Sequence, residues 1–143
     1  KQVTKVVFLL NITKVGDCVC VFASNLIVVA IPEGITIIGE SSFAFCSSLK
    51  DIKFPKSLTS IDSFSFGGCS SLEEVDLLHT NVQELGEGAF YKCRSLREMK
   101  VPDSLQTLGE DVFYKCSKLV PSDIDIGYGH DVHKVVAYLR SIQ

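Results

Sequence analysis

Short stretches of alternating apolar and polar residues recur along the chain at a nearly constant distance. In each stretch two apolar residues flank one residue of the opposite face, as in Val29 with Ile31 and in Val75 with Leu77. A period of two indicates a short strand with one buried face. A proline follows most of these stretches, beginning with Pro32, and its fixed φ and missing amide donor end a strand. The pattern predicts a series of equivalent short strands, each ended by a turn.

The stretches belong to blocks of 23 or 24 residues. Each block opens with leucine, and phenylalanine, cysteine and two aliphatic residues stand at fixed positions further on. The recurring sets are Leu26, Leu49, Leu72, Leu96 and Leu119; Phe43, Phe66, Phe90 and Phe113; Cys46, Cys69, Cys93 and Cys116; Ile35, Leu58, Val82 and Leu105; and Ile38, Ile61, Leu85 and Leu108. With a weaker first copy, the sequence predicts one domain over 1–143, with repeats at about 3–25, 26–48, 49–71, 72–95 and 96–118 and a cap at 119–143.

A single block cannot fold alone. About seven buried apolar side chains, at roughly 2 kcal/mol each, do not offset about 1–2 kcal/mol of backbone entropy per residue. Stacked coils would share one core, and their strands would form a parallel sheet. We expect an α/β solenoid with this sheet on one face and short helical or 3₁₀ turns on the other. The repeat at 72–95, the third of the four full copies, is one residue longer within Leu78–Asn81, where a bulge is expected.

The repeat pattern ends after Leu119. Ile124 and Ile126 can add a last short strand, and the apolar residues from Asp131 to Ile142 follow helical spacing. We expect this helix to cover the last coil; a helical interaction motif is the alternative.

The segments 31–39 and 85–96 closely resemble the BspA-like class of leucine-rich repeat, through their recurrent Ile-Gly, Phe and Cys-x-x-Leu elements. The resemblance covers 3–119, although the repeat at 3–25 lacks the Phe and Cys signatures and the repeat at 72–95 lacks the proline. It implies a right-handed leucine-rich-repeat coil and a non-catalytic scaffold for adhesion or recognition. It also implies an extracellular or cell-surface location, with an organellar or membrane-associated complex as the alternative.

The outward positions of the strands are the candidate binding site, because successive strand side chains alternate between faces. The candidate residues are Val7, Ile27, Val28, Ala30, Asp51, Lys53, Glu74, Asp76, Glu98 and Lys100. Clustered aliphatic residues at the first repeats indicate contact with a protein partner or with a preceding coil. The charged half is equally well explained as solvated surface. The chain is therefore expected to bind a protein reversibly, or alternatively to be a structural subunit held permanently in a larger complex.

Composition limits the other functions. A net charge of −3 offers no basic surplus for nucleic acid, and no apolar run approaches the roughly 20 residues of a membrane-spanning helix. The start at Lys1 is expected of a processed chain or a fragment.

No catalytic, cofactor or metal site is expected. The cysteine column is read as buried reduced thiols, and Cys18-x-Cys20 has no second pair at zinc-ligand spacing. His130 and His133 would suit a metal only if an acidic or thiol partner converged on them, so a solvated capping helix is preferred. Asn11-Ile12-Thr13 matches a glycosylation acceptor, although such triplets are frequent by chance.

Overall fold

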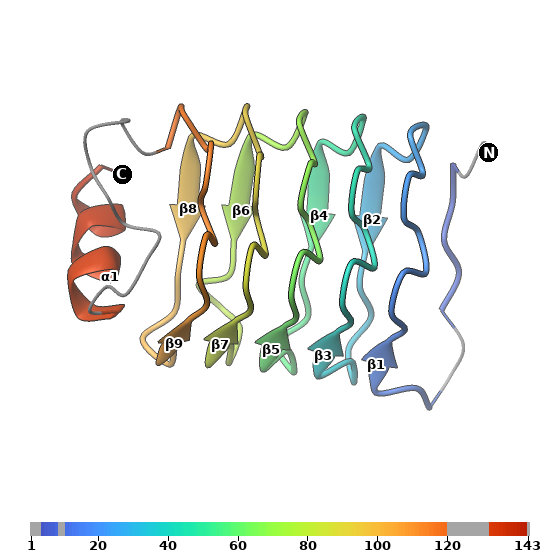
Figure 1. Ribbon diagram of the computed structural model, residues 1–143. Coiled ribbons are helices and arrows are strands. Elements are labelled where there is room, and N and C mark those ends of the chain that lie inside the picture. Colours follow the sequence, from blue (N-terminus) through green and yellow to red (C-terminus); the bar gives the residue numbers. More distant parts are fainter. Residues whose placement is uncertain (1–3, 9–10, 120–131, 143) are drawn as a thin grey trace.

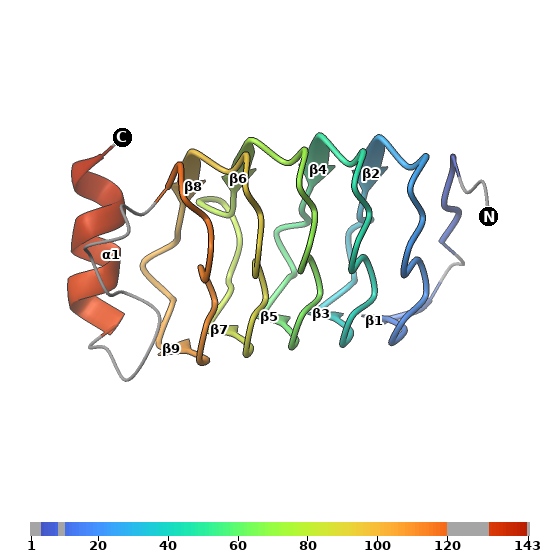
Figure 2. The ribbon, with the colours of Figure 1, turned by 45° about the horizontal axis from the view of Figure 1, so that its top comes forward.

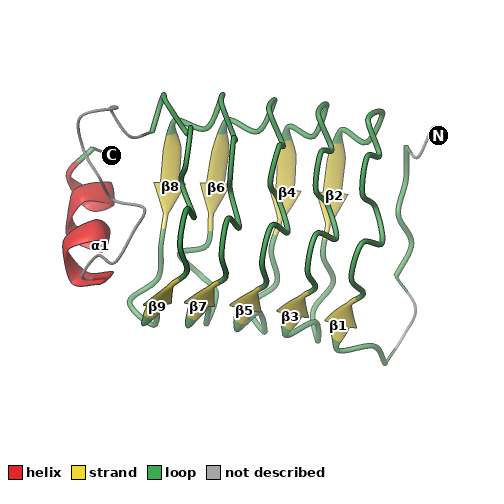
Figure 3. Cartoon of the chain, viewed as in Figure 1, coloured by secondary structure: helices red, strands yellow, loops and turns green. Residues whose placement is uncertain are grey.

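The computed structural model describes residues 4–8, 11–119 and 132–142. The coils stack along one axis, with the N-terminal segment at one end and helix α1 (Val132–Ser141) at the other (Figure 1). Each coil from residue 26 to 118 passes through a strand on one face, a second strand at an edge, and a row of turns on the remaining face, and of the two strands the first coil has the edge strand alone (Figure 3). The predicted solenoid of stacked coils with parallel strands and a C-terminal helix is confirmed.

The expected sheet face contains β2 (Val28–Ala30), β4 (Asp51–Lys53), β6 (Glu74–Asp76) and β8 (Glu98–Lys100). These strands pair in parallel as β2–β4 and β6–β8 and do not form one continuous ladder. The ladder is interrupted between β4 and β6, where the longer repeat at 72–95 begins. There His79 Nε2 donates to the Phe54 carbonyl at 2.8 Å and Asn81 Nδ2 to the Lys56 carbonyl at 3.0 Å. A turn at 78–79, where the extra residue was expected to bulge, brings these two side chains back to the preceding coil.

The first apolar stretch departs from expectation. Residues 4–8 are not a strand, although Val6 and Phe8 pack against the core and Val7 points outward as the alternation predicted. A hollow of about 410 Å³ lies between them and the segment Ala30–Glu33 of the second coil. This space separates the two backbones, so β2 is the end strand of its sheet.

A second sheet, which the sequence did not predict, has more strands than either part of the expected sheet in the described part of the chain. It joins β1 (Lys14–Val15), β3 (Ile37–Ile38), β5 (Ser60–Ile61), β7 (Glu84–Leu85) and β9 (Thr107–Leu108) in parallel order along one edge of the stack. Each strand has only two residues, too few for an alternation to appear in the sequence. One of its inward columns was recognised as core, but its backbone pairing was not.

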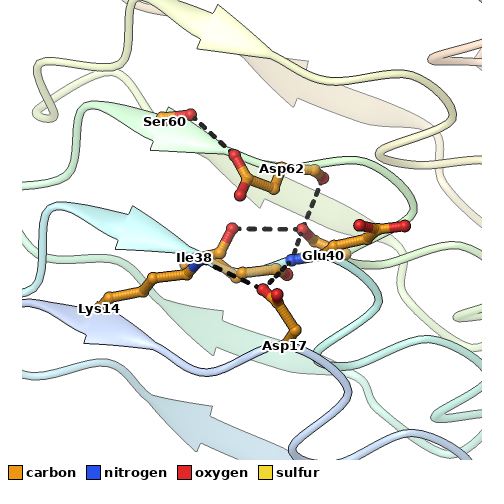
Figure 4. A network of polar contacts seen from close by, with 8 residues as sticks. Lys14, Asp17, Ile38, Glu40, Ser60 and Asp62 are labelled. Atoms are coloured by element: carbon orange, nitrogen blue, oxygen red, sulfur yellow. Dashed lines mark hydrogen bonds and ion pairs between the residues drawn. The ribbon is translucent and has the colours of Figure 1, made fainter.

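Polar side chains join adjacent coils beside this edge sheet (Figure 4). The Glu40 amide donates to Asp17 Oδ1 at 2.9 Å, and the same carboxylate pairs with Lys14 at 3.3 Å. The Asp62 amide donates to the Ile38 carbonyl at 2.9 Å. Each coil is therefore fixed to its neighbour by both backbone and side-chain hydrogen bonds.

The turn face, nearest the viewer in Figure 1, has turns closed by hydrogen bonds of 3₁₀ span, for example from the Ala44 amide to the Ser41 carbonyl at 3.1 Å. These turns do not lengthen into helices, because two residues in each coil take positive φ, such as Ser41 (53°) and Phe45 (58°). Alternate amides instead donate to the next coil, as Phe43 does to the Ser65 carbonyl at 2.9 Å and Phe45 to Gly67 at 2.7 Å. The turn face is thus held together across coils.

Aligned phenylalanines fill the core. Phe43, Phe66 and Phe90 are fully buried, and the Phe66 ring centroid lies 5.4 Å from that of Phe43 and 5.5 Å from that of Phe90. Phe113 continues the stack at 6.3 Å from Phe90. The predicted phenylalanine column is confirmed.

Helix α1 covers the last coil, which Figure 2 shows from a second direction. Val135 and Leu139 are buried, and Val132 and Val136 pack against the core. Tyr138 Oη donates to the Leu119 carbonyl at 3.3 Å. The capping role predicted for this helix is confirmed, whereas the strand expected at Ile124 and Ile126 lies outside the described residues.

Candidate functional site

The ten candidate residues lie together on the outer surface of the first coil and of β2, β4, β6 and β8. Registered pairing places Val28 beside Asp51 and Ala30 beside Lys53. In the later pair of strands, Glu74 lies beside Glu98 and Asp76 beside Lys100. Glu98 and Lys100 are partly buried; the other eight are exposed.

The end of this face at the first repeats is apolar. Val7 is 73% exposed, Val28 54% and Ile27 52%, although burial is the normal state of such large aliphatic side chains. Val7 and Ala30 also line the 410 Å³ hollow beside β2. Two of the exposed aliphatic residues therefore border a concave feature. We call the four exposed aliphatic residues at this end of the face the apolar patch: Val7, Ile27, Val28 and Ala30.

The other end of the face is charged, and its charges partly pair with one another. Arg97, which the sequence analysis did not select, lies 3.3 Å from Glu73 and 3.3 Å from Glu74. Lys100 Nζ lies 3.6 Å from Glu98. Exposed pairs of this kind contribute little to stability, so these charges remain able to interact with a partner.

A second surface feature was missed by sequence reasoning. Exposed and half-exposed aromatic side chains follow the turn face from the first to the fifth coil: Phe22, Phe45, Phe64, Tyr91 and Tyr114. Phe22 stacks on Phe45 with ring centroids 5.0 Å apart, and Tyr91 stacks on Tyr114 at 5.1 Å. The available signal was a second aromatic residue within two positions of the core column, as in Phe43-Ala44-Phe45 and Phe64-Ser65-Phe66.

The recurring cysteines lie in the hydrophobic core. Cys46, Cys69, Cys93 and Cys116 are buried and unbridged, as expected of reduced thiols, and each donates to a carbonyl of the preceding coil at 3.0–3.2 Å. Burial raises the pKa of the Cys46 thiol to about 11 and also raises the pKa of Cys69 and of Cys93. Such thiols are poor nucleophiles and poor metal ligands, because both roles require the thiolate.

Within the described part of the chain, no three His, Cys, Asp or Glu side chains are grouped so as to hold a metal. Cys18 is exposed and Cys20 is buried, and His79 binds a backbone carbonyl, as described above. His130 lies outside the described residues, so whether an acidic or thiol partner converges on His130 and His133 stays untested. No described helix is long and apolar enough to cross a membrane.

Three solved structures of leucine-rich-repeat proteins resemble this chain. A Treponema pallidum (T. pallidum) leucine-rich repeat protein matches with a TM-score of 0.73 at 27% identity, over 76% of this chain and 50% of its own. A Bacteroides ovatus leucine-rich repeat protein matches with a TM-score of 0.70 at 27% identity, over 76% of this chain and 28% of its own. A leucine-rich cell surface protein from Faecalibacterium prausnitzii matches with a TM-score of 0.76 at 22% identity, over 100% of this chain and 35% of its own. At this identity the likeness is one of fold alone. This chain spans half or less of each.

A search of curated proteins finds no match. The family model of the BspA-type leucine-rich repeat region matches residues 2–127 in six copies. With the stacked phenylalanines, the parallel strands and the buried cysteine column, this match over most of the sequence shows that the chain belongs to the BspA-type leucine-rich repeat family.

Proposed function

We propose that this chain is a non-catalytic protein-binding scaffold. In this proposal a partner docks on the outer face of β2, β4, β6 and β8 and on the exposed first coil. The observation that carries the proposal is the apolar patch, because large aliphatic side chains gathered on an otherwise charged face favour contact with another protein. Desolvation of Val7, Ile27 and Val28 would provide affinity. The charges at Asp51, Glu74 and Asp76 would set orientation and salt dependence.

The double variant Val28→Asp, Ala30→Asp tests this proposal. Both side chains point outward and are exposed, so the variant should fold normally while two carboxylates enter the patch. A matched control adds the same two charges through Gln106→Asp, Thr107→Asp, two exposed and uncharged positions at the edge sheet of the last coil. We expect partner capture to fall at least about tenfold with the first variant and to stay within about twofold with the control.

Capture should be measured by photo-crosslinking from position 27 in extracts of the source cells, followed by mass spectrometry. The partner identified in this way is then purified and titrated against wild type and both variants. Equal affinity of wild type and the Val28→Asp, Ala30→Asp variant would contradict the proposed face.

A permanent structural subunit is the second candidate. It is supported by the concentration of exposed large apolar residues in the first two coils, which includes Val19 (56%) and Phe22 (65%) on the turn side. An obligate interface is more apolar than a reversible one. Size-exclusion chromatography with light scattering separates the two: a soluble monomer supports the reversible scaffold, whereas aggregation relieved by co-expressed partner supports the subunit.

The proposal includes an extracellular or cell-surface location. It is supported by the family and by the F. prausnitzii neighbour, which is a leucine-rich cell surface protein. Protease treatment of intact cells should remove the protein; protection from protease would favour the alternative, an internal or membrane-associated complex.

A further inference from the structure

A hollow of about 360 Å³ opens among the turns of the turn face, away from the strands that carry the apolar patch. Three aromatic residues line it: Phe45, Phe64 and Tyr91. Ser41 and Asp111 supply its polar side chains, and Ala44 and Gly67 complete the lining. Residues from four successive coils thus form one site.

The hollow exists because the row of outer side chains is interrupted. Tyr91 and Tyr114 occupy the same position in successive coils and stack at 5.1 Å, but the equivalent residue of the preceding coil is Gly67. Backbone packing does not require this glycine, since a Cβ there would meet its nearest neighbour at 3.4 Å. The missing side chain leaves an open space beside the rings of Phe64 and Tyr91, whose centroids lie 5.8 Å apart in an edge-to-face arrangement.

The surroundings favour a cation. Acidic side chains follow the coil edge immediately before the aromatic row, at Asp17, Glu40, Glu87 and Glu110, and Asp111 lines the hollow itself. Cations of the chain already contact two rings of this row: Lys92 Nζ lies 5.1 Å from the centroid of Tyr91, which lines the hollow, and Lys115 Nζ lies 5.4 Å from that of the neighbouring Tyr114. At the corresponding position of the third coil stands Gly68, so this coil supplies no lysine of its own there.

We propose that this hollow binds the guanidinium group of an arginine side chain from a partner protein. A planar guanidinium can stack on an aromatic face while its N–H groups pair with a carboxylate, which uses both the ring lining and Asp111. A lysine ammonium is more strongly hydrated and lacks the planar face, so it fits less well. The site is independent of the sheet-face proposal, since no residue is shared between them.

The test titrates the full chain, labelled with ¹⁵N, with a blocked Gly-Arg-Gly peptide. The comparison peptides replace arginine with lysine or with the uncharged isostere citrulline, and methyl glucoside probes a neutral sugar. We expect saturable amide shifts at Phe64, Gly67 and Gly68 with the arginine peptide. The citrulline peptide should bind at least about tenfold more weakly.

Three variants locate the binding. Asp111→Asn keeps the volume and suits the positive φ of this residue (57°), and it should weaken arginine binding about fivefold to tenfold. Gly67→Val, which restores the residue type of Val21 at this position, should fill the hollow and abolish the shifts. Asp51→Asn, which removes the same charge from the sheet face, is the matched control and should leave the affinity unchanged.

The inference is overturned if citrulline or methyl glucoside binds as well as arginine does, or if no saturable binding occurs. It is equally overturned if Asp51→Asn weakens binding as much as Asp111→Asn. The Val28→Asp, Ala30→Asp variant should retain arginine binding, so the failure of one proposed surface is distinguishable from the failure of the other.

Discussion

Truncation of Phe66 should be among the most damaging single changes in this protein. Its ring is fully buried and contacts three others: Phe43 at 5.4 Å, Phe90 at 5.5 Å and Phe54 edge-on at 5.8 Å. Removing a buried phenylalanine side chain costs about 3–5 kcal/mol, and each lost aromatic pair adds to the burial term. We therefore expect Phe66→Ala to lower the free energy of unfolding by about 5 kcal/mol.

Two further truncations calibrate this value. Phe113 stands at the end of the column with one stacked partner at 6.3 Å, so Phe113→Ala should cost about 3 kcal/mol. Phe45 is 46% exposed, and Phe45→Ala should cost about 1 kcal/mol. Urea unfolding followed by circular dichroism gives all three values, provided that the slope of the free energy of unfolding against urea concentration is the same in each variant. A Phe66→Ala variant no less stable than Phe45→Ala would refute the aligned core.

Three other predictions follow from individual contacts. Ser65 Oγ donates to the Asp62 carbonyl at 2.6 Å, whereas the buried Ser42 Oγ has no partner among the described residues. In urea unfolding, Ser65→Ala should lower the free energy of unfolding by about 1 kcal/mol, and Ser42→Ala should leave it unchanged. Gly88→Ala would place a Cβ 2.3 Å from the Phe64 ring and should lower the melting temperature, with Gly67→Ala as the tolerated control. Burial raises the pKa of Cys46 to about 11, whereas an unfolded thiol ionises near pH 8.5. The contribution of this thiol to the free energy of unfolding should therefore be fully present below about pH 8.5 and be lost as the pH rises toward 11. Cys46→Ala, which places at this position the residue type of Ala23, should make the urea midpoint less sensitive to alkaline pH.

The parts of the fold that the sequence predicted are those in which like residues superpose. A period of 23 residues identified Phe43 and Phe66 as neighbours, and the structure stacks them with an interplanar angle of 2°. The same period predicted the burial of the cysteines, and helical spacing predicted the capping role of Val135 and Leu139. The phenylalanine and cysteine columns could be predicted because each recurs at one position in successive coils, which stacking brings together.

The period does not specify the backbone path between the columns. The edge strands have two residues each, so Ile37–Ile38 carries no alternation that would distinguish a strand from a turn. The hollow on the turn face was equally hidden, because it depends on the side chain absent at Gly67 and on the orientations of Phe64 and Tyr91. Such features depend on differences between coils, which a search for similarity overlooks.

Stacking and recognition should therefore be separable in this molecule. Inward columns stay apolar from coil to coil, whereas one outward row changes from Val28 to Asp51 and Glu74 across adjacent strands. An exposed residue contributes little to the shared core, so Val28→Asp, Ala30→Asp should change binding without changing the urea midpoint. A mild core change such as Cys46→Ala should shift the midpoint and leave the affinity of the folded protein intact. If binding and stability instead changed together in both variants, the apolar patch would have to be part of the packing between coils and not a surface for a partner.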